Sequence, residues 1–181
     1  VIDWSKVDSL LKDVDFIVAH NARFDRAFVD KNSSISPKKI WACSIKDIDW
    51  FSKGFSNQKQ ELLCYWHGFY CDAHRAMNDV DALIQLMIHP YYDKNRPILE
   101  LIKNAKKIIC KILVTNFPYD EQKKDMIKSH GYKWNTKEKI WYKEIFQKEL
   151  EFEKNYLSET VYDGQFRGSY EEINPNEKYK S

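Results

Sequence analysis

Two stretches in the first half of the chain combine histidine and carboxylate side chains that could take part in acid–base chemistry. The first runs from His20 to Asp25 (HNARFD), and the second runs from His74 to Asp79 (HRAMND). A histidine with its ordinary pKa of about 6.5 can accept a proton at cellular pH. Each stretch also has an ordinary structural explanation, because an aspartate in a first helical turn favours the helix dipole and a loop histidine is usually solvated.

The hydrophobic pattern places both stretches at junctions between secondary-structure elements. Residues 15–20 form a short apolar run with β-branched residues, which predicts a buried strand, and Asn21 then begins a helix as its N-cap. Asp25 would project from the first turn of this helix, near the carboxyl end of the strand. Positions five apart on a helix point about 140° away from each other, so we place His74 on a loop and Asp79 at the start of the next helix.

The same pattern predicts the other elements of the first hundred residues. We expect a strand over 39–43, a short helix that begins at Ser44 and ends before Gly54, a helix over 61–66 and a helix over 77–88. Apolar residues surround most of the last helix, so we expect it to be well buried.

The order His-Asn-x-x-Phe-Asp followed by His-x4-Asp resembles the second and third exonuclease motifs of the DEDDh class, the family of the proofreading epsilon subunit of bacterial DNA polymerase III. The strand over 14–19 and the helical run Val80-Asp-Ala-Leu83 are also similar to that family. The resemblance covers residues 1 to about 90. It implies an α/β, RNase H-like exonuclease fold and a 3′-5′ exonuclease that acts on single-stranded 3′ ends, with DNA favoured over RNA.

The resemblance also implies a role for each matching residue. Asp25 and Asp79 match carboxylates that bind two divalent metal ions, Mg²⁺ or Mn²⁺, and His74 matches the general base that deprotonates the attacking water. Two such ions about 4 Å apart can stabilise both the attacking and the leaving oxygen of an in-line displacement. We expect the substrate to contact three further residues of the second motif: His20, Asn21 and Phe24.

One motif of the family is missing from this sequence. The class carries a first motif, Asp-x-Glu, on a strand upstream of the second motif, and this motif supplies two of its four carboxylates. Neither Asp13-Val-Asp15 nor Asp47-Ile-Asp49 fits, since the former leads into the strand over 15–20 and the latter falls in the helix predicted after Ser44. We therefore expect a longer natural protein. This chain would be inactive in isolation, and its partner would be the missing amino-terminal segment or a polymerase or repair complex.

The rest of the chain predicts a small α+β domain with the order strand, helix, hairpin, helix. Its strand covers 108–114, its first helix 120–130, and the turn of its hairpin 135–138. The expected division of the chain is an exonuclease portion over 1–94, a connecting helix over 95–107, the small domain over 108–163 and a flexible tail over 164–181.

Basic charge is concentrated in one part of the chain. Residues 103–148 carry 12 basic and 5 acidic side chains, whereas the net charge of the whole chain is +2. Trp134 and Trp141 flank the predicted turn among these lysines. Bases stack on aromatic rings and lysines follow phosphates, so we predict a small basic domain that binds single-stranded nucleic acid through Lys133, Trp134 and Lys139. Alternatively, at least one tryptophan packs the hairpin onto the helix as core.

Composition narrows the class of protein. With 5 glycines and 5 prolines among 181 residues, the chain is neither fibrous nor of low complexity. No stretch approaches the roughly 18 apolar residues of a membrane helix, so we expect no membrane contact and a cytoplasmic location. Cys64, His67, Cys71 and His74 are zinc-ligand types, but Cys64 lies on a predicted helix and His74 matches the exonuclease pattern, so we disfavour structural zinc.

A second functional hypothesis is a non-catalytic nucleic-acid-binding or scaffold protein on a degenerate exonuclease fold. In that case the second domain would do the binding, and the run over 131–142 is indeed similar to small modules of DNA-processing proteins, including a domain of DNA-annealing helicases. The presence of Asp25, His74 and Asp79 together favours the enzyme, because a scaffold has no chemical need for all three.

Overall fold

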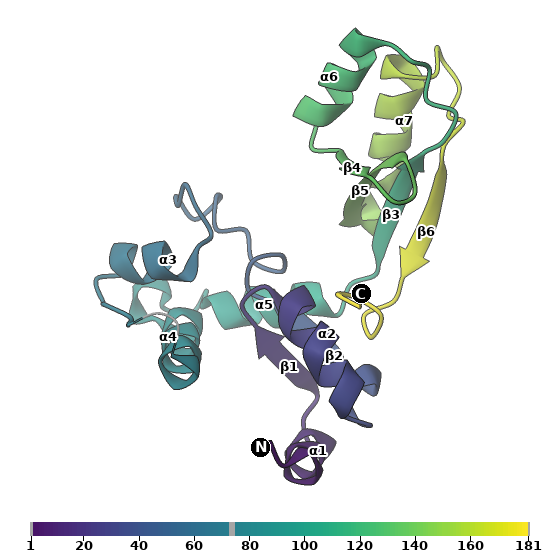
Figure 1. Ribbon diagram of the computed structural model, residues 1–181. Helices are drawn as coiled ribbons and strands as arrows, with labels where there is room; N and C mark the ends of the chain where they lie inside the picture. The colour runs from purple at the N-terminus through teal and green to yellow at the C-terminus, as the bar shows by residue number, and fades with distance from the viewer. Residues whose placement is uncertain (1, 73–74, 181) are drawn as a thin grey trace. The chain divides into compact units, whose positions relative to one another are not determined.

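The computed structural model describes residues 2–72 and 75–180 and shows a mixed α/β protein. Within these residues it has seven α-helices and two small sheets, and the chain divides into two compact units (Figure 1). Unit 1 contains residues 1–106 and 175–181, and unit 2 contains residues 107–174. Among the described helices, none combines the length and the hydrophobicity that crossing a bilayer requires.

The sheet of unit 1 is a parallel pair formed by β1 (Phe16–Ala19) and β2 (Ile40–Cys43). A parallel pair needs a crossover connection, which α2 (Ala22–Asn32) and the 3₁₀ turn Ser36–Lys38 supply. The carboxyl end of β1 therefore leads directly into the helix that carries Asp25, as the sequence predicts. Within the described residues, β1 pairs with β2 and with no other strand.

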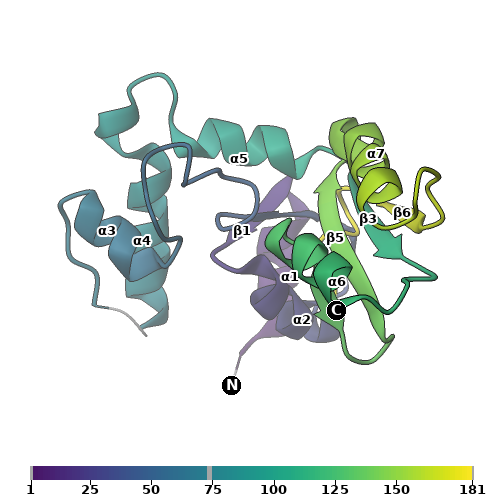
Figure 2. The same cartoon turned by 90° about the horizontal axis from the view of Figure 1, so that it is seen from above.

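Three further helices complete the core of unit 1. They are α3 (Gln60–Trp66), α4 (Ala76–Ile88) and α5 (Pro97–Ala105), and a 3₁₀ turn over Pro90–Tyr92 separates the last two. Figure 2 shows α3 and α4 beside each other. Leu63, Leu86 and Leu101, one from each helix, are fully buried in one cluster with Trp50. The helix that the sequence assigns to a connector over 95–107 thus belongs to the core of unit 1, because Leu101 and Ala105 face that cluster.

The short helix expected after Ser44 is not formed, and this part of the prediction is wrong. Residues 44–53 form turns instead. The carbonyl of Ser44 accepts the indole N–H of Trp50 at 2.7 Å, and a carboxylate oxygen of Asp47 accepts the N–H of Cys43 at 2.8 Å. The Trp50 bond takes the carbonyl that would accept the first hydrogen bond of a helix capped by Ser44, and the Asp47 bond holds that side chain against the end of β2, so turns replace the helix.

The first helix of the structure, α1 (Trp4–Lys12), has no counterpart among the predicted elements. Its signal is nevertheless present in the sequence, because Asp3 is a good N-cap residue and its carboxylate accepts the N–H groups of Ser5 and Lys6.

The expectation that the helix over 77–88 is well buried holds for one face of α4. Ala82, Leu86 and Met87 are buried, whereas Val80, Ile84 and other apolar side chains of the helix are about half exposed. In the described residues, too few elements pack around α4 to cover its whole apolar surface.

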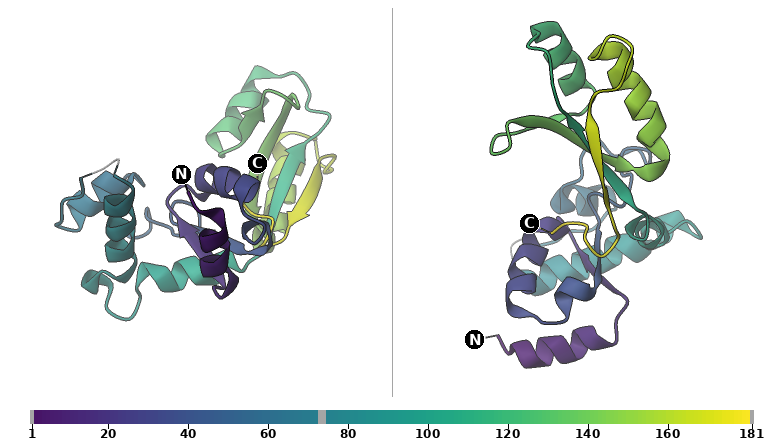
Figure 3. Two further views of the ribbon diagram at one scale, coloured as in Figure 1. Left: turned by 60° about the horizontal axis from the view of Figure 1, so that its bottom comes forward. Right: turned by 90° about the vertical axis from the view of Figure 1, so that its right-hand side faces the viewer.

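Unit 2 is a four-stranded antiparallel sheet with two helices on one face. The strand order is β4-β5-β3-β6, where the strands are β3 (Ile109–Val114), β4 (Lys133–Asn135), β5 (Ile140–Phe146) and β6 (Ser169–Ile173). The helices are α6 (Glu121–Ser129) and α7 (Leu150–Thr160), the latter preceded by a 3₁₀ turn over Gln147–Glu149. Alternate residues of β3 face both helices, which Figure 3 shows on the same side of the sheet.

The hairpin of unit 2 confirms the predicted turn. The side chain of Asn135 accepts the N–H groups of Lys137 and Glu138, a typical turn interaction of asparagine. This turn sets the register in which Trp134 lies opposite Trp141.

The flexible tail predicted for 164–181 is replaced by ordered structure. β6 pairs with β3 along five residues, from Ile173 opposite Ile109 to Ser169 opposite Leu113. Residues beyond 174 return to unit 1, where Lys178 is buried. A polar composition suggested fraying, but the polar side chains here find hydrogen-bond partners.

His67 is a titratable group enclosed by aromatic side chains in unit 1. Its Nδ1 lies 2.6 Å from the carbonyl of Leu63, its Nε2 lies 2.6 Å from the hydroxyl of Tyr92, and its ring stacks on Phe55. Burial lowers the pKa of His67 below its usual value, and the neighbouring His89 adds to this shift.

We expect acid to destabilise the fold through this histidine. Below about pH 6.5 the unfolded chain binds a proton on His67 that the folded chain does not bind, so the free energy of unfolding falls. Above that pH both states are neutral and His67 contributes no pH dependence. Urea unfolding from pH 5 to 8 should therefore show a shallower pH dependence in His67→Gln than in the parent protein. The same pH profile in both proteins would contradict this assignment.

Candidate active site

The structure brings the two motif carboxylates of unit 1 to one hollow. A pocket of about 750 Å³ is lined by the carboxyl end of β1, the first turn of α2 and the first turns of α4, and both Asp25 and Asp79 are among its lining residues. His20 and Phe24 line it as well. Residues 54 positions apart in the sequence therefore share one concave surface, because a parallel strand and its crossover helix meet α4 at this point.

Asp25 is half-buried in this hollow. Burial raises the pKa of the Asp25 carboxyl above its usual range, and a backbone N–H in its own helical turn only partly opposes the shift. A carboxylate that loses hydration in this way gains from a nearby cation, which would restore the lost interaction with charge.

His20 forms part of the wall of the hollow and links two backbone segments. Its Nδ1 lies 2.7 Å from the Ser44 hydroxyl, whose residue follows β2. Burial lowers the pKa of His20, while the backbone of Gln58 and the charge of Asp79 oppose that shift. The predicted contact of His20 with substrate stays a prediction, since in this structure the ring joins the ends of the two strands.

Asp79, the other motif aspartate that lines the hollow, lies in the first turn of α4. Its backbone carbonyl accepts the side-chain amide of Gln60 at 2.5 Å, so the start of α4 is joined to the start of α3. The carboxylate remains partly accessible at the wall of the hollow. His74, the predicted general base, lies outside the residues that the structure describes.

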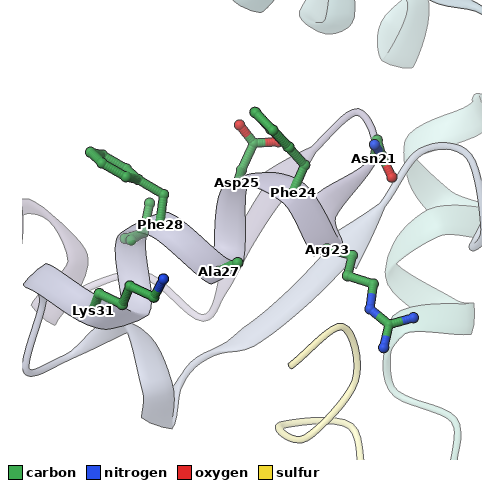
Figure 4. A pocket seen from close by; sticks show the side chains of 8 residues that line it. Asn21, Arg23, Phe24, Asp25, Ala27, Phe28 and Lys31 are labelled. Carbon is green, nitrogen blue, oxygen red and sulfur yellow. The ribbon is translucent and has the colours of Figure 1, made fainter. Parts of the chain in front are cut away.

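Asn21 and Phe24 lie at the open side of α2. Asn21 has a left-handed backbone (φ 67°), which asparagine tolerates better than most residues, and its side chain makes no capping bond. Phe24 is 76% exposed, and Figure 4 shows Phe24, Asp25 and Phe28 projecting to the same side of the helix while Arg23 points elsewhere. The exposed rings of Phe24 and Phe28 thus form an apolar surface beside the Asp25 carboxylate, next to the hollow.

No group of three or more histidine, cysteine, aspartate or glutamate side chains is placed to hold a metal ion within residues 2–72 and 75–180. Of the zinc-like set, Cys64, His67 and Cys71 are described and form no such group, whereas His74 lies outside the described residues. Burial raises the pKa of the Cys64 thiol to about 12, which disfavours the thiolate, and both ring nitrogens of His67 face the Leu63 carbonyl and the Tyr92 hydroxyl.

The candidate residues of unit 2 lie together on the hairpin. Lys133 and Lys139 are exposed, and Trp134 is 46% exposed with its ring centroid 5.4 Å from that of Trp141. Trp141 packs against the core of the unit. Each alternative therefore describes one of the two tryptophans: Trp141 packs as core, and Trp134 remains accessible.

The basic character predicted for the small domain is local. Residues 107–174 carry 12 basic and 12 acidic side chains, so unit 2 as a whole is neutral. Several of its lysines are also paired, because Lys143 contacts Glu153 at 3.0 Å and Lys123 contacts Asp163 at 3.0 Å. The accessible positive charge next to Trp134 comes from Lys133, Lys137 and Lys139.

Sequence reasoning missed one buried polar group beside the hollow. Arg26, directly after Asp25, is fully buried, and its Nε donates to Asp30 Oδ2 at 3.0 Å. A signal was available, since positions 22, 26 and 29 form the inner face of an amphipathic helix and a charged residue at the middle position requires a partner. The sequence does not reveal that the partners lie some 150 residues away.

Comparison of this chain with family models, with curated proteins and with solved structures found no match. The functional interpretation therefore depends on the residues and on their geometry.

Proposed function

We propose that this chain is the carboxy-terminal part of a DEDDh-type 3′-5′ exonuclease with an RNase H-like fold. The observation that carries the proposal is the convergence of Asp25 and Asp79 on one hollow at the carboxyl end of β1. In α/β folds with parallel strands, ligands commonly bind outside the carboxyl ends of the strands. Of the three matching residues, the two that are described thus lie where a phosphodiester could reach them.

Two uncovered surfaces of unit 1 support the proposal that a further segment of the protein completes this fold. β1 has one described partner strand, all four of its residues are half-buried, and α4 exposes apolar side chains such as Val80 and Ile84. An unpaired strand edge and an exposed apolar face are both costly to leave in water. A strand that carries the missing first motif could pair with β1 and bring its carboxylates to the hollow.

The described residues do not by themselves make a two-metal site. Asp25 and Asp79 supply two carboxylates, whereas a pair of Mg²⁺ ions in a hydrolase requires more oxygen ligands than these. The contribution of this chain is to hold two half-buried carboxylates at the wall of the hollow, beside the exposed ring of Phe24.

The proposal is tested with a longer protein that includes the sequence upstream of Val1 in its gene. We expect this protein to shorten a 5′-labelled single-stranded DNA, or a matching RNA, from its 3′ end when Mg²⁺ is present and not in EDTA. The chain described here should leave both substrates intact. Binding without cleavage by both proteins would favour a non-catalytic scaffold, which the small number of converging carboxylates also allows.

The hairpin of unit 2 is expected to contribute affinity for single strands. Stacking of a base on an exposed aromatic ring is worth about 1–3 kcal/mol, so Trp134→Ala should weaken binding of an oligo-dT by roughly 10-fold. Fluorescence anisotropy measures this at two salt concentrations, since contacts of Lys133 and Lys139 with phosphates should weaken as salt rises. The matched control is Tyr119→Ala, another highly exposed aromatic of unit 2. Equal losses in both variants would place the binding surface elsewhere.

A further inference from the structure

The residue after Asp25 joins α2 to a distant part of the chain. Arg26 is fully buried, and its Nη1 donates to the carbonyl of Lys178 at 2.6 Å while its Nη2 donates to the carbonyl of Asn176 at 2.8 Å. Both acceptors belong to residues 175–180, which we call the C-terminal segment. A buried guanidinium must find such acceptors because it stays charged and water does not reach it.

The C-terminal segment is itself held in unit 1 by buried side chains. The ammonium of Lys178 donates to the carbonyl of Asn104 at 2.7 Å and lies 3.5 Å from Asp47, and the hydroxyl of Tyr179 donates to Asp47 at 2.9 Å. Asp47 also accepts the N–H of Cys43 at the end of β2. The segment therefore connects α5 and the end of β2 to the inner face of α2.

The position of α2 depends on this inner face. On its outer face Phe24 is 76% exposed and Phe28 is about half exposed, with the ring of Trp4 in α1 packed against Phe28, so this side of α2 is only partly covered (Figure 4). Neighbouring residues on a helix point about 100° apart, and a rotation of α2 that displaced Arg26 would turn Asp25 relative to Asp79. Contacts that fix Arg26 thus also fix the direction of the Asp25 carboxylate.

We propose that the C-terminal segment positions α2, and with it Asp25, through the carbonyl groups of Asn176 and Lys178, which accept from Arg26 together with the carbonyl of Pro37. Arg26 is a positioning residue in this arrangement, and it touches neither substrate nor metal. The ordering of α2 is independent of what the hollow does, whereas the consequence for Asp25 rests on the proposed function.

Hydrogen exchange in the full chain tests the ordering of α2. Lys178→Met removes the buried ammonium that anchors the C-terminal segment, and the matched control Lys180→Met removes an ammonium that pairs with Glu177 nearer the surface. We expect the α2 amides to exchange at least 10-fold faster in Lys178→Met, with unchanged rates in α6 and α7 and no change in Lys180→Met. Equal α2 rates in the two variants, or equal acceleration throughout unit 1, would overturn the proposal.

A milder variant keeps the test decisive if Lys178→Met does not fold. Tyr179→Phe removes a single hydroxyl that donates to Asp47, and it should produce a smaller acceleration confined to α2. If Tyr179→Phe left the α2 exchange rates unchanged and Lys178→Met unfolded as a whole, the C-terminal segment would stabilise unit 1 without positioning α2. That result would overturn the proposal.

The consequence for Asp25 is measured in the longer protein as the Mn²⁺ concentration that gives half-maximal nuclease activity. Lys178→Met should raise this concentration at least 5-fold without changing the KM for the oligonucleotide, and Lys180→Met should leave both unchanged. Faster exchange of α2 with an unaltered Mn²⁺ requirement would overturn the positioning of Asp25. If the longer protein cleaves nothing, the proposed function fails, while hydrogen exchange still decides whether the segment orders α2.

Discussion

Asp25→Asn is expected to lower the kcat of the completed nuclease at least about 1,000-fold, which corresponds to about 4 kcal/mol of transition-state stabilisation. The amide keeps the size of the side chain but cannot supply the negative charge that a divalent cation requires. Because burial raises the pKa of the Asp25 carboxyl, a proton competes with the cation at this position, and activity should also decline at acidic pH. The measurement is single-turnover cleavage of a 5′-labelled strand at saturating protein.

The control for this prediction comes from the same part of the protein. Asp81 lies two residues after Asp79 on α4, is exposed and does not line the hollow. Asp79→Asn should resemble Asp25→Asn, and Asp81→Asn should retain the activity of the parent protein. Similar rates for Asp25→Asn and Asp81→Asn would show that the hollow is not the site of the reaction.

Arg26→Met is expected to reduce the free energy of unfolding of unit 1 by about 3 kcal/mol. The methionine side chain fits an apolar interior, but it leaves the buried carbonyl of Lys178 and the partly buried carbonyl of Asn176 without their donor and the Asp30 carboxylate without its cation. Removing one partner of a buried charged network typically costs about 3–5 kcal/mol. Urea unfolding followed by circular dichroism measures the change.

Arg23→Met is the matched control, because Arg23 lies three residues earlier on the same helix and is exposed. Surface substitutions of this kind usually change stability by less than about 0.5 kcal/mol. A loss in Arg23→Met as large as that in Arg26→Met would mean that helix propensity, and not the buried hydrogen bonds, accounts for the effect.

The local elements of this protein could be predicted because their signals are local. The β-branched run before Asn21, the helical spacing after it and the turn chemistry of Asn135 each depend on a few adjacent residues, and the structure contains β1, α2 and the hairpin where they were expected. The turns after Ser44 were not predicted because they depend on side-chain bonds from the Trp50 indole to the Ser44 carbonyl and from the Cys43 N–H to the Asp47 carboxylate, which the hydrophobic pattern does not show.

Long-range pairing could not be predicted in the same way. The polar stretch after Gly164 has no alternation of hydrophobic residues that would predict a strand. β6 forms there because it pairs with the edge of β3. Similarly, nothing near Arg26 in the sequence indicates that the carbonyls of Asn176 and Lys178 are its acceptors. These long-range contacts depend on how the whole chain folds, so residues adjacent in the sequence do not reveal them.

The candidate site was predicted in part. The family resemblance implied that Asp25 and Asp79 serve one site, and in the structure both residues line one hollow, at a strand-to-helix junction and at the start of a helix. The role of His20 in joining the wall to Ser44 and the pairing of Lys143 with Glu153 were not visible from residue types. Roles of individual residues depend on which neighbours occupy their hydrogen bonds.

The most direct measurement is the location of Mn²⁺ in crystals of the longer protein, found from its anomalous scattering. Our account predicts an ion with carboxylate oxygens of both Asp25 and Asp79 among its oxygen neighbours, within about 2.5 Å of at least one of them. An ion bound elsewhere, or a hollow that stays free of Mn²⁺ at concentrations that saturate nuclease activity, would contradict the claim that these two carboxylates form the catalytic centre.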